Sequence, residues 1–125
     1  MPRPRIIELS EAQEQELLFE WAARESHRWP ELRMMFHVPN GGSRDIREAA
    51  NLKKQGVKSG VPDIFLAVPR GGYHGLFIEM KRRDGGRLSV AQREWIDALR
   101  EIDYRVEVCK GFGQAAKVLL EYLND

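Results

Sequence analysis

The fold of this chain is decided by residues 60–81, which read GVPDIFLAVPRGGYHGLFIEMK. This segment contains two apolar runs, at 60–68 and 75–81, that are rich in β-branched and aromatic residues. Glycine and proline bound the runs, and a Gly-Gly pair at 71–72 lies between them. The pattern predicts an antiparallel β-hairpin.

The register of this hairpin determines which polar side chains meet. If the strands pair symmetrically about Gly71, Asp63 lies directly across from Glu79, at about 5 Å. Lys81 follows Glu79 by two residues and therefore shares its face of the sheet. Two carboxylates at that distance repel by about 3 kcal/mol at an effective dielectric constant near 20, and a divalent cation reverses the sign of this interaction. We therefore expect a metal site at one end of the hairpin.

The length and composition of the chain suit one globular domain over residues 1–125. Of its 125 residues, 42% are hydrophobic and 31% charged, which is enough for one core and too little for two. The single cysteine, Cys109, excludes an intramolecular disulfide and is expected in the core of a cytoplasmic protein. No apolar run approaches the roughly 20 residues of a membrane span. Residues 1–5 lead into no signal-type segment, so we expect neither export nor membrane association.

The other elements are predicted from apolar periodicity and from helix caps. The predicted helices cover residues 11–29, 43–55, 89–102 and 114–123, and the predicted strands cover 32–38, 60–68, 75–81 and 105–109. The resulting order is α-β-α-β-β-α-β-α. It predicts an α/β fold in which helices flank a mixed β-sheet.

Two polar residues fall at the start of apolar helical stripes. Glu14 lies one turn before Leu17 and Leu18, so it is either an acid in line with the buried face or a residue at the solvated end of the helix. Gln92 lies three residues after Ser89, the spacing of a capping box. A site role for Gln92, such as orienting water or a phosphate, is an equal alternative to capping.

Two groups of basic residues flank the predicted metal site in the sequence. One lies on the second helix and the loop after it, and the other follows Glu79-Met80 at the end of the hairpin. The members beyond Lys81 itself are Arg44, Arg47, Lys53, Lys54, Lys58, Arg82, Arg83 and Arg87. Either group alone is consistent with a solvated surface, whereas two groups around one acidic site favour a phosphate backbone as the partner.

Several short motifs occur in a particular order along the chain. They are HVPNGG at 37–42, GVPD at 60–63, IEMK at 78–81 and LS at 88–89, followed by Gln92 and Trp95. The Pro-Asp and Glu-Met-Lys motifs resemble the signature of the PD-(D/E)xK nuclease superfamily. The full order resembles its virus-type replication-repair nuclease (VRR-NUC) domains, in the small stand-alone form found in phages and bacteria. The resemblance covers nearly the whole chain.

This resemblance implies a restriction-endonuclease-like PD-(D/E)xK core and a metal-dependent phosphodiesterase that acts on DNA. Some stand-alone VRR-NUC proteins are dimeric resolvases of four-way (Holliday) junctions, so the resemblance also implies a homodimer and branched DNA as partner. Carried over to this chain, Asp63 and Glu79 are metal ligands, Lys81 is the catalytic lysine and Gln92 is the glutamine of the following helix. Products with 5′-phosphate and 3′-hydroxyl ends are expected.

The resemblance also implies an acid on the first helix. Glu14 matches that acid, and Glu11, which lies close to the same helical face, is the alternative. Such an acid would hold a second cation or its water, and the choice between one and two metal ions stays open.

The expected cofactor is Mg²⁺ or Mn²⁺. Hard carboxylate oxygens from Asp63 and Glu79 suit these ions, and the backbone carbonyl of Met80 offers another ligand. A bound ion of this kind acidifies water and offsets charge on the phosphate. Lys81 would then orient or deprotonate the water or hold a phosphate oxygen, and the sequence leaves these roles open.

Two other functions are compatible with the sequence. In a non-catalytic DNA-binding module, Asp63, Glu79 and Lys81 would form a structural salt bridge, and DNA binding would not depend on divalent metal. A hydrolase or transferase of small phosphorylated substrates would need a glycine-rich phosphate loop. The glycines at 41–42 are the only candidate and lack any P-loop or Rossmann pattern.

A homodimer would need apolar surface beyond the needs of a small core. The candidate residues, each of which is also compatible with ordinary core packing, are Trp29, Met34, Met35, Leu119, Tyr122 and Leu123.

Overall fold

The structure is a computed structural model, and it describes residues 8–40 and 45–125. The elements in this part of the chain are α1 (Glu11–Glu25), the 3₁₀ helix η1 (Pro30–Met34), β1 (Met35–His37), α2 (Ile46–Lys54), β2 (Ile64–Leu66), β3 (Leu76–Lys81), α3 (Val90–Glu101), β4 (Arg105–Lys110) and α4 (Phe112–Leu123). Their order is the predicted one, with η1 added after α1.

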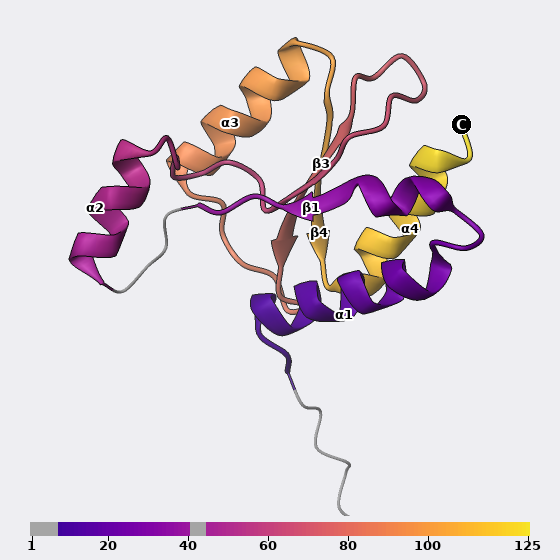
Figure 1. Cartoon of the computed structure of the whole chain (residues 1–125), viewed down its shortest axis with the longest axis horizontal. Coiled ribbons are helices and arrows are strands. Elements are labelled where there is room, and N and C mark those ends of the chain that lie inside the picture. Colours follow the sequence, from indigo (N-terminus) through magenta and orange to yellow (C-terminus); the bar gives the residue numbers. More distant parts are fainter. Residues whose placement is uncertain (1–7, 41–44) are drawn as a thin grey trace, which may run out of the picture.

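The four strands form one mixed sheet in the order β1-β2-β3-β4. The first two pairs are antiparallel, and β3 and β4 are parallel. In Figure 1, α1 and α4 lie together on one side of the sheet, α3 lies on the other side, and α2 stands apart at the left. The predicted α/β fold, a mixed sheet flanked by helices, is therefore confirmed.

The hairpin of β2 and β3 has the predicted register. Ile64 pairs with Ile78 and Leu66 pairs with Leu76. Asp63 directly precedes β2, so the same register places it across from Glu79. The side chains of Asp63 and Glu79 are thereby on one face of the sheet.

The turn of this hairpin reaches that register by an unexpected route. Arg70 and Tyr73 pair across the glycines at 71–72, which have φ values of 56° and 86°, as a two-residue type I′ turn requires. The turn is thus centred between the two glycines rather than on the first. Arg70 lies four residues after Leu66, whereas Tyr73 lies only three residues before Leu76. The first arm of the hairpin therefore has one extra residue, which compensates for the shifted turn and keeps Leu66 opposite Leu76.

The main core lies between the sheet and the pair α1 and α4. Cys109 is 1% exposed there, as predicted. A smaller cluster, made of Ile96, Leu99 and Val106, joins α3 to the other face of the sheet. Of the six apolar residues considered for a dimer interface or for ordinary core packing, four belong to the main core, namely Met35, Leu119, Tyr122 and Leu123.

The segment after α1 differs from the prediction. The helix was expected to reach residue 29 but ends at Glu25, and η1 replaces the first part of the strand expected at 32–38. Pro30 explains the difference, because its fixed φ suits the first position of a new helical turn. Leu32 then reaches the core from η1, and only three residues remain for β1.

Helix α2 also differs from its prediction. Asp45 caps it, since its carboxylate accepts hydrogen bonds from the backbone N–H groups of Arg47 and Glu48. Its apolar residues recur with helical periodicity, yet none of its residues is buried, and Ile46 is 84% exposed. None of the helices in the described ranges has the length and apolar character that crossing a membrane requires.

Candidate active site

The end of the β2–β3 hairpin brings together three of the predicted site residues. Asp63 Oδ2 accepts a hydrogen bond of 2.7 Å from the backbone N–H of Met80. Glu79 is 2% exposed, and its Oε1 lies 3.8 Å from Nζ of Lys81, which is 7% exposed. Two acids and a lysine are therefore held, largely buried, at one edge of the sheet.

Gln92 joins this group from the start of α3. Its Oε1 accepts hydrogen bonds from the backbone N–H of Ser89 at 2.9 Å and from Nζ of Lys81 at 3.3 Å. Its Nε2 donates a hydrogen bond of 2.9 Å to Oε1 of Glu79. The capping role of Gln92 is therefore confirmed, and the same side chain is hydrogen-bonded to both Glu79 and Lys81.

Strand β1 fixes the backbone of Asp63 from the other side. The Asp63 carbonyl accepts hydrogen bonds from the backbone N–H of Val38 at 2.7 Å and from Nδ1 of His37 at 2.9 Å. No role for His37 was predicted from the sequence. The sequence feature that points to His37 is its position: it lies at the end of a predicted strand and is the first residue of the HVPNGG motif.

These side chains line a cavity of about 360 Å³. Its walls come from α1, the end of β1 and the residues after it, the residue before β2, β3 and α3. The lining residues are Glu11, Ala12, Gln15, His37, Asn40, Asp63, Glu79, Met80, Lys81 and Gln92.

The electrostatics of the site favour a cation. Burial, and then the charge of Asp63, raise the pKa of Glu79 from 4.5 to about 8, while Lys81 acts in the opposite direction. In the absence of a cation, Glu79 therefore keeps a proton at neutral pH. A divalent ion beside Asp63 and Glu79 would displace that proton, because it compensates the repulsion between the two carboxylates.

The donor set fits a hard cation that keeps much of its own water. In residues 8–40 and 45–125, no group of three or more His, Cys, Asp or Glu side chains is arranged to hold a metal ion. The carboxylates of Asp63 and Glu79, with Met80 beside them in the cavity wall, instead offer a partial set of oxygen ligands. Mg²⁺ commonly binds in this way, through one or two carboxylates plus water and substrate phosphate.

The two acids of α1 have different surroundings. Glu11 lines the cavity, and its Oε1 lies 3.9 Å from Nζ of Lys81. Glu14 is 0% exposed, and both of its carboxylate oxygens accept hydrogen bonds from Nε of Arg83, at 3.1 and 2.9 Å. The structure therefore brings Glu11, and not Glu14, to the group around Lys81.

The Glu14–Arg83 pair connects α1 to the loop after β3. The Arg83 guanidinium lies 6.0 Å from the centre of the Phe112 ring. Gly111 has φ 86°, and a Cβ there would lie 2.7 Å from the Arg83 side chain and 3.1 Å from Glu14. Only glycine fits this position without strain. Glu14, placed by the sequence among the site acids, thus has a structural partner.

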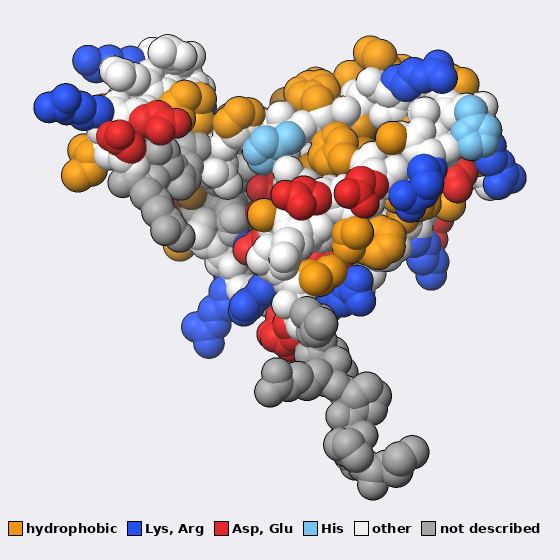
Figure 2. All heavy atoms as spheres, turned by 60° about the horizontal axis from the view of Figure 1, so that its bottom comes forward, with side chains coloured by type: hydrophobic (Ala, Val, Ile, Leu, Met, Phe, Trp, Pro, Cys, Tyr) orange, Lys and Arg blue, Asp and Glu red, His pale blue; other side chains and the backbone are white. Residues whose placement is uncertain are grey.

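The predicted DNA-binding residues lie on two exposed parts of the molecule. Arg44 lies outside the described residues. Arg47, Lys53, Lys54 and Lys58 are exposed on α2 and the loop after it, and Arg82, Arg83 and Arg87 are exposed in the loop after β3. In Figure 2, basic side chains gather at the outer end of α2, which forms a lobe set off from the rest of the molecule by a notch.

Comparisons with known proteins agree with this fold. The sequence matches the VRR-NUC domain family over residues 4–113. A solved structure described as a VRR_NUC domain protein is similar to this one with a TM-score of 0.80 and 31% sequence identity, over 94% of this chain and 91% of that chain. A comparison with curated proteins gave no significant match. Because the family match covers most of the sequence and the fold is shared, this chain belongs to the VRR-NUC family of nuclease domains.

Proposed function

We propose that this protein is a DNA endonuclease that depends on Mg²⁺ or Mn²⁺ and hydrolyses phosphodiester bonds at the cavity around Asp63, Glu79 and Lys81. One observation carries the proposal: two carboxylates face each other at the end of the hairpin, and Glu79 is 2% exposed with a pKa raised to about 8. Two ionised carboxylates directly opposite each other in a sheet are destabilising, and without a cation Glu79 avoids this only by keeping its proton.

The residues that would hold the ion are Asp63 and Glu79, with the Met80 carbonyl as a further ligand. When bound, the ion would make water more acidic and would offset negative charge on the phosphate. The protein itself keeps the ligands in place. Met80 N–H and Gln92 each donate a hydrogen bond to one carboxylate, which fixes the orientation of both side chains.

Lys81 supplies a positive charge next to the reacting phosphate. Lys81 is 7% exposed, and its ammonium group donates to Gln92 and lies between Glu79 and Glu11. In this position it would hold a non-bridging phosphate oxygen or the attacking water while remaining in contact with the acids. We assign the site role of the α1 acid to Glu11, because Glu11 lines the cavity and Glu14 is bound to Arg83.

DNA is the polymer that the surface favours. Exposed basic residues lie on α2 and on the loop after β3, and this loop begins at the site itself. Lys and Arg at such positions bind phosphates without reading the base sequence. We therefore expect the enzyme to select DNA by shape.

Branched DNA, such as a four-way junction, is the substrate we propose, with a homodimer as the active form. One chain carries one such site, whereas resolving a junction needs two symmetric cuts, which a two-fold dimer provides. Of the earlier interface candidates, Met34 remains 52% exposed, and Trp29 packs partly against the core. Light scattering at micromolar concentration tests the dimer, and a monomeric mass would refute it.

The experiment for the activity compares four-way-junction, flapped, single-stranded and linear duplex DNA, each in Mg²⁺ and in EDTA. We expect cleavage only with Mg²⁺ and a preference for the junction. Asp63→Asn and Glu79→Gln should each reduce cleavage by at least about 100-fold, with DNA binding near that of the wild type. Glu94→Gln, a change at an exposed acid of α3, is the matched control and should cleave normally.

Near-wild-type cleavage by either site variant would refute the site assignment. Equal cleavage of junction and linear duplex would reduce the function to a DNA endonuclease without shape preference. DNA binding of equal strength with and without Mg²⁺, and without cleavage, would instead support a non-catalytic DNA-binding module.

A further inference from the structure

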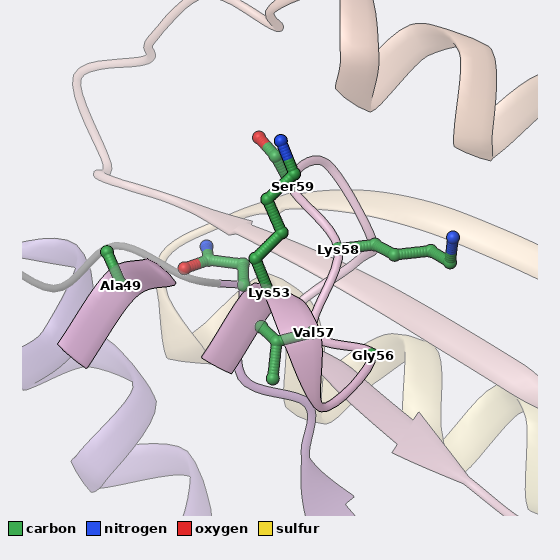
Figure 3. A pocket seen from close by; sticks show the side chains of 7 residues that line it. Ala49, Lys53, Gly56, Val57, Lys58 and Ser59 are labelled. Atoms are coloured by element: carbon green, nitrogen blue, oxygen red, sulfur yellow. The ribbon is translucent and has the colours of Figure 1, made fainter. Parts of the chain in front are cut away.

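A second cavity, of about 440 Å³, lies between α2 and the loop that leads to β2. Its lining residues are Asn40, Ala49, Lys53, Gly56, Val57, Lys58 and Ser59. Its volume is within the range of roughly 300–1,000 Å³ that is usual for small-molecule sites. In Figure 3, the Lys53 side chain extends toward Ser59, whereas Lys58 points away from both.

This cavity adjoins the active-site cavity. Asn40 lines both of them, so they lie on either side of one residue. The loop from Gly56 to Ser59 leads within a few residues to Asp63, and this loop forms most of the other wall. A ligand in the second cavity would therefore lie beside a phosphate held at Asp63 and Glu79.

The lining combines an apolar wall with cationic and polar groups. Ala49 and Val57 offer apolar contacts, and Lys53 and Ser59 offer an ammonium and a hydroxyl group to an anion. All residues that line the cavity in the described part of the chain are neutral or basic. A nucleotide has the matching chemistry, because its base is flat and largely apolar on both faces and its phosphate is anionic.

We infer that this cavity receives one unpaired nucleotide of the DNA substrate, the one next to the cleaved phosphate. The inference rests on the proposed nuclease function and deepens it. A base inside a continuous duplex is paired and stacked on both sides, so extruding it into such a cavity is costly, whereas a base at a branch point is less fully stacked and a base in a flap is unpaired, so either enters at a lower cost. The cavity would thus favour branched DNA over linear duplex within a single protomer.

The adjacent alanines of α2 provide a matched pair of variants. Ala49 lines the cavity, whereas Ala50 is exposed and is not among the lining residues. Ala49→Trp should fill the cavity, and Ala50→Trp should add the same side chain outside it. Because α2 contributes no buried residue to the core, both variants should fold.

The experiment uses a four-way junction and a linear duplex, each with 2-aminopurine on one side or the other of the cleaved bond. Fluorescence is measured in EDTA, so the signal is independent of catalysis. With the wild type and Ala50→Trp, we expect at least a two-fold rise in the fluorescence of one junction position. With Ala49→Trp the rise should be lost. In Mg²⁺, Ala49→Trp should lose the preference for the junction but still cleave linear duplex.

A second matched pair tests the cavity without adding bulk. Lys53 lines the cavity, and the next residue, Lys54, is exposed outside it. Lys53→Ala should reduce the junction preference several-fold more than Lys54→Ala, although each removes one positive charge from α2. Equal effects would mean that α2 acts only through its net charge, and would overturn the inference.

The outcomes separate this inference from the proposed function. If the wild type cleaves junctions but both tryptophan variants behave like it, or both lose cleavage alike, the inference is wrong and the nuclease assignment stands. If Ala49→Trp reduces cleavage of linear duplex as much as that of the junction, the cavity does not select unpaired nucleotides and the inference is also wrong. A wild type that cleaves no DNA in Mg²⁺ would refute both.

Discussion

Replacing Glu79 by Gln is expected to change how the stability of the metal-free protein depends on pH. Burial and the neighbouring Asp63 raise the pKa of Glu79 from 4.5 to about 8. Below about pH 4.5, this side chain is protonated in both the folded and the unfolded protein. Between about pH 4.5 and 8, the unfolded chain loses the proton and the folded protein keeps it. The free energy of unfolding should therefore fall as the pH rises through this range, and level off above it.

The size of this effect follows from the pKa change. Each pKa unit is worth about 1.4 kcal/mol, so a rise from 4.5 to about 8 corresponds to an upper limit of about 5 kcal/mol. Solvent that enters the cavity screens the charge, and we expect a measured effect of about 2 to 4 kcal/mol. Gln keeps the shape of the side chain and still accepts the hydrogen bond from Gln92, but it does not ionise.

The assay is urea unfolding, followed by tryptophan fluorescence in EDTA between pH 5 and 8.5. Glu79→Gln should match the wild type near pH 5 and exceed its stability by about 2 to 4 kcal/mol at pH 8.5. Glu94→Gln, at an exposed position, is the control for removing an acid. At pH 8, Mg²⁺ should stabilise the wild type but have much less effect on Glu79→Gln and on Asp63→Asn.

Parallel stability profiles for the wild type and Glu79→Gln would refute the reasoning, because they would mean that Glu79 ionises equally easily in both states. Equal stabilisation of all three proteins by Mg²⁺ would argue against metal binding at this pair.

Three further predictions concern residues near the site. Glu11→Gln should reduce cleavage on the order of ten-fold with little change in melting temperature. Glu14→Gln should lower the melting temperature and leave cleavage near normal. The reverse pattern would mean that Glu14, and not Glu11, is the α1 acid of the active site. Arg82→Ala should weaken binding to all DNA sequences alike and flatten its salt dependence, and a loss confined to particular sequences would contradict this. Arg83→Ala should also lower the melting temperature, because it leaves the buried carboxylate of Glu14 without its hydrogen-bond donor.

The placement of Asp63 across from Glu79 was predictable because it depends on local sequence. Two apolar runs around a Gly-Gly turn define a hairpin, and the alternation of side chains along a strand places Lys81 on the face of Glu79. The turn was predicted to be centred on Gly71 but is centred between Gly71 and Gly72. The predicted strand register is nevertheless correct, because the segment before Arg70 contains one extra residue. The capping box at Ser89 is local in the same way, and it placed Gln92 at the start of α3.

Only the tertiary structure decided which acid of α1 joins the site. Glu11 and Glu14 are three residues apart, so helical periodicity places both on nearly the same face and does not distinguish them. The difference comes from Arg83 and Gly111, which are distant in sequence and which bind or approach Glu14 only in the folded chain. His37 is a similar case, since its hydrogen bond to the Asp63 carbonyl joins residues 26 positions apart.

The exposure of α2 was also decided by tertiary structure. An amphipathic pattern shows that a helix has an apolar side, but it does not show whether another element packs against that side. In this fold α1, α3 and α4 cover the sheet, and α2 remains outside with Ile46 exposed. The sequence thus determined the pairs of residues that interact through local strand and helix geometry. Contacts between distant segments, which depend on how those elements pack, determined the rest of the site and its neighbouring cavity.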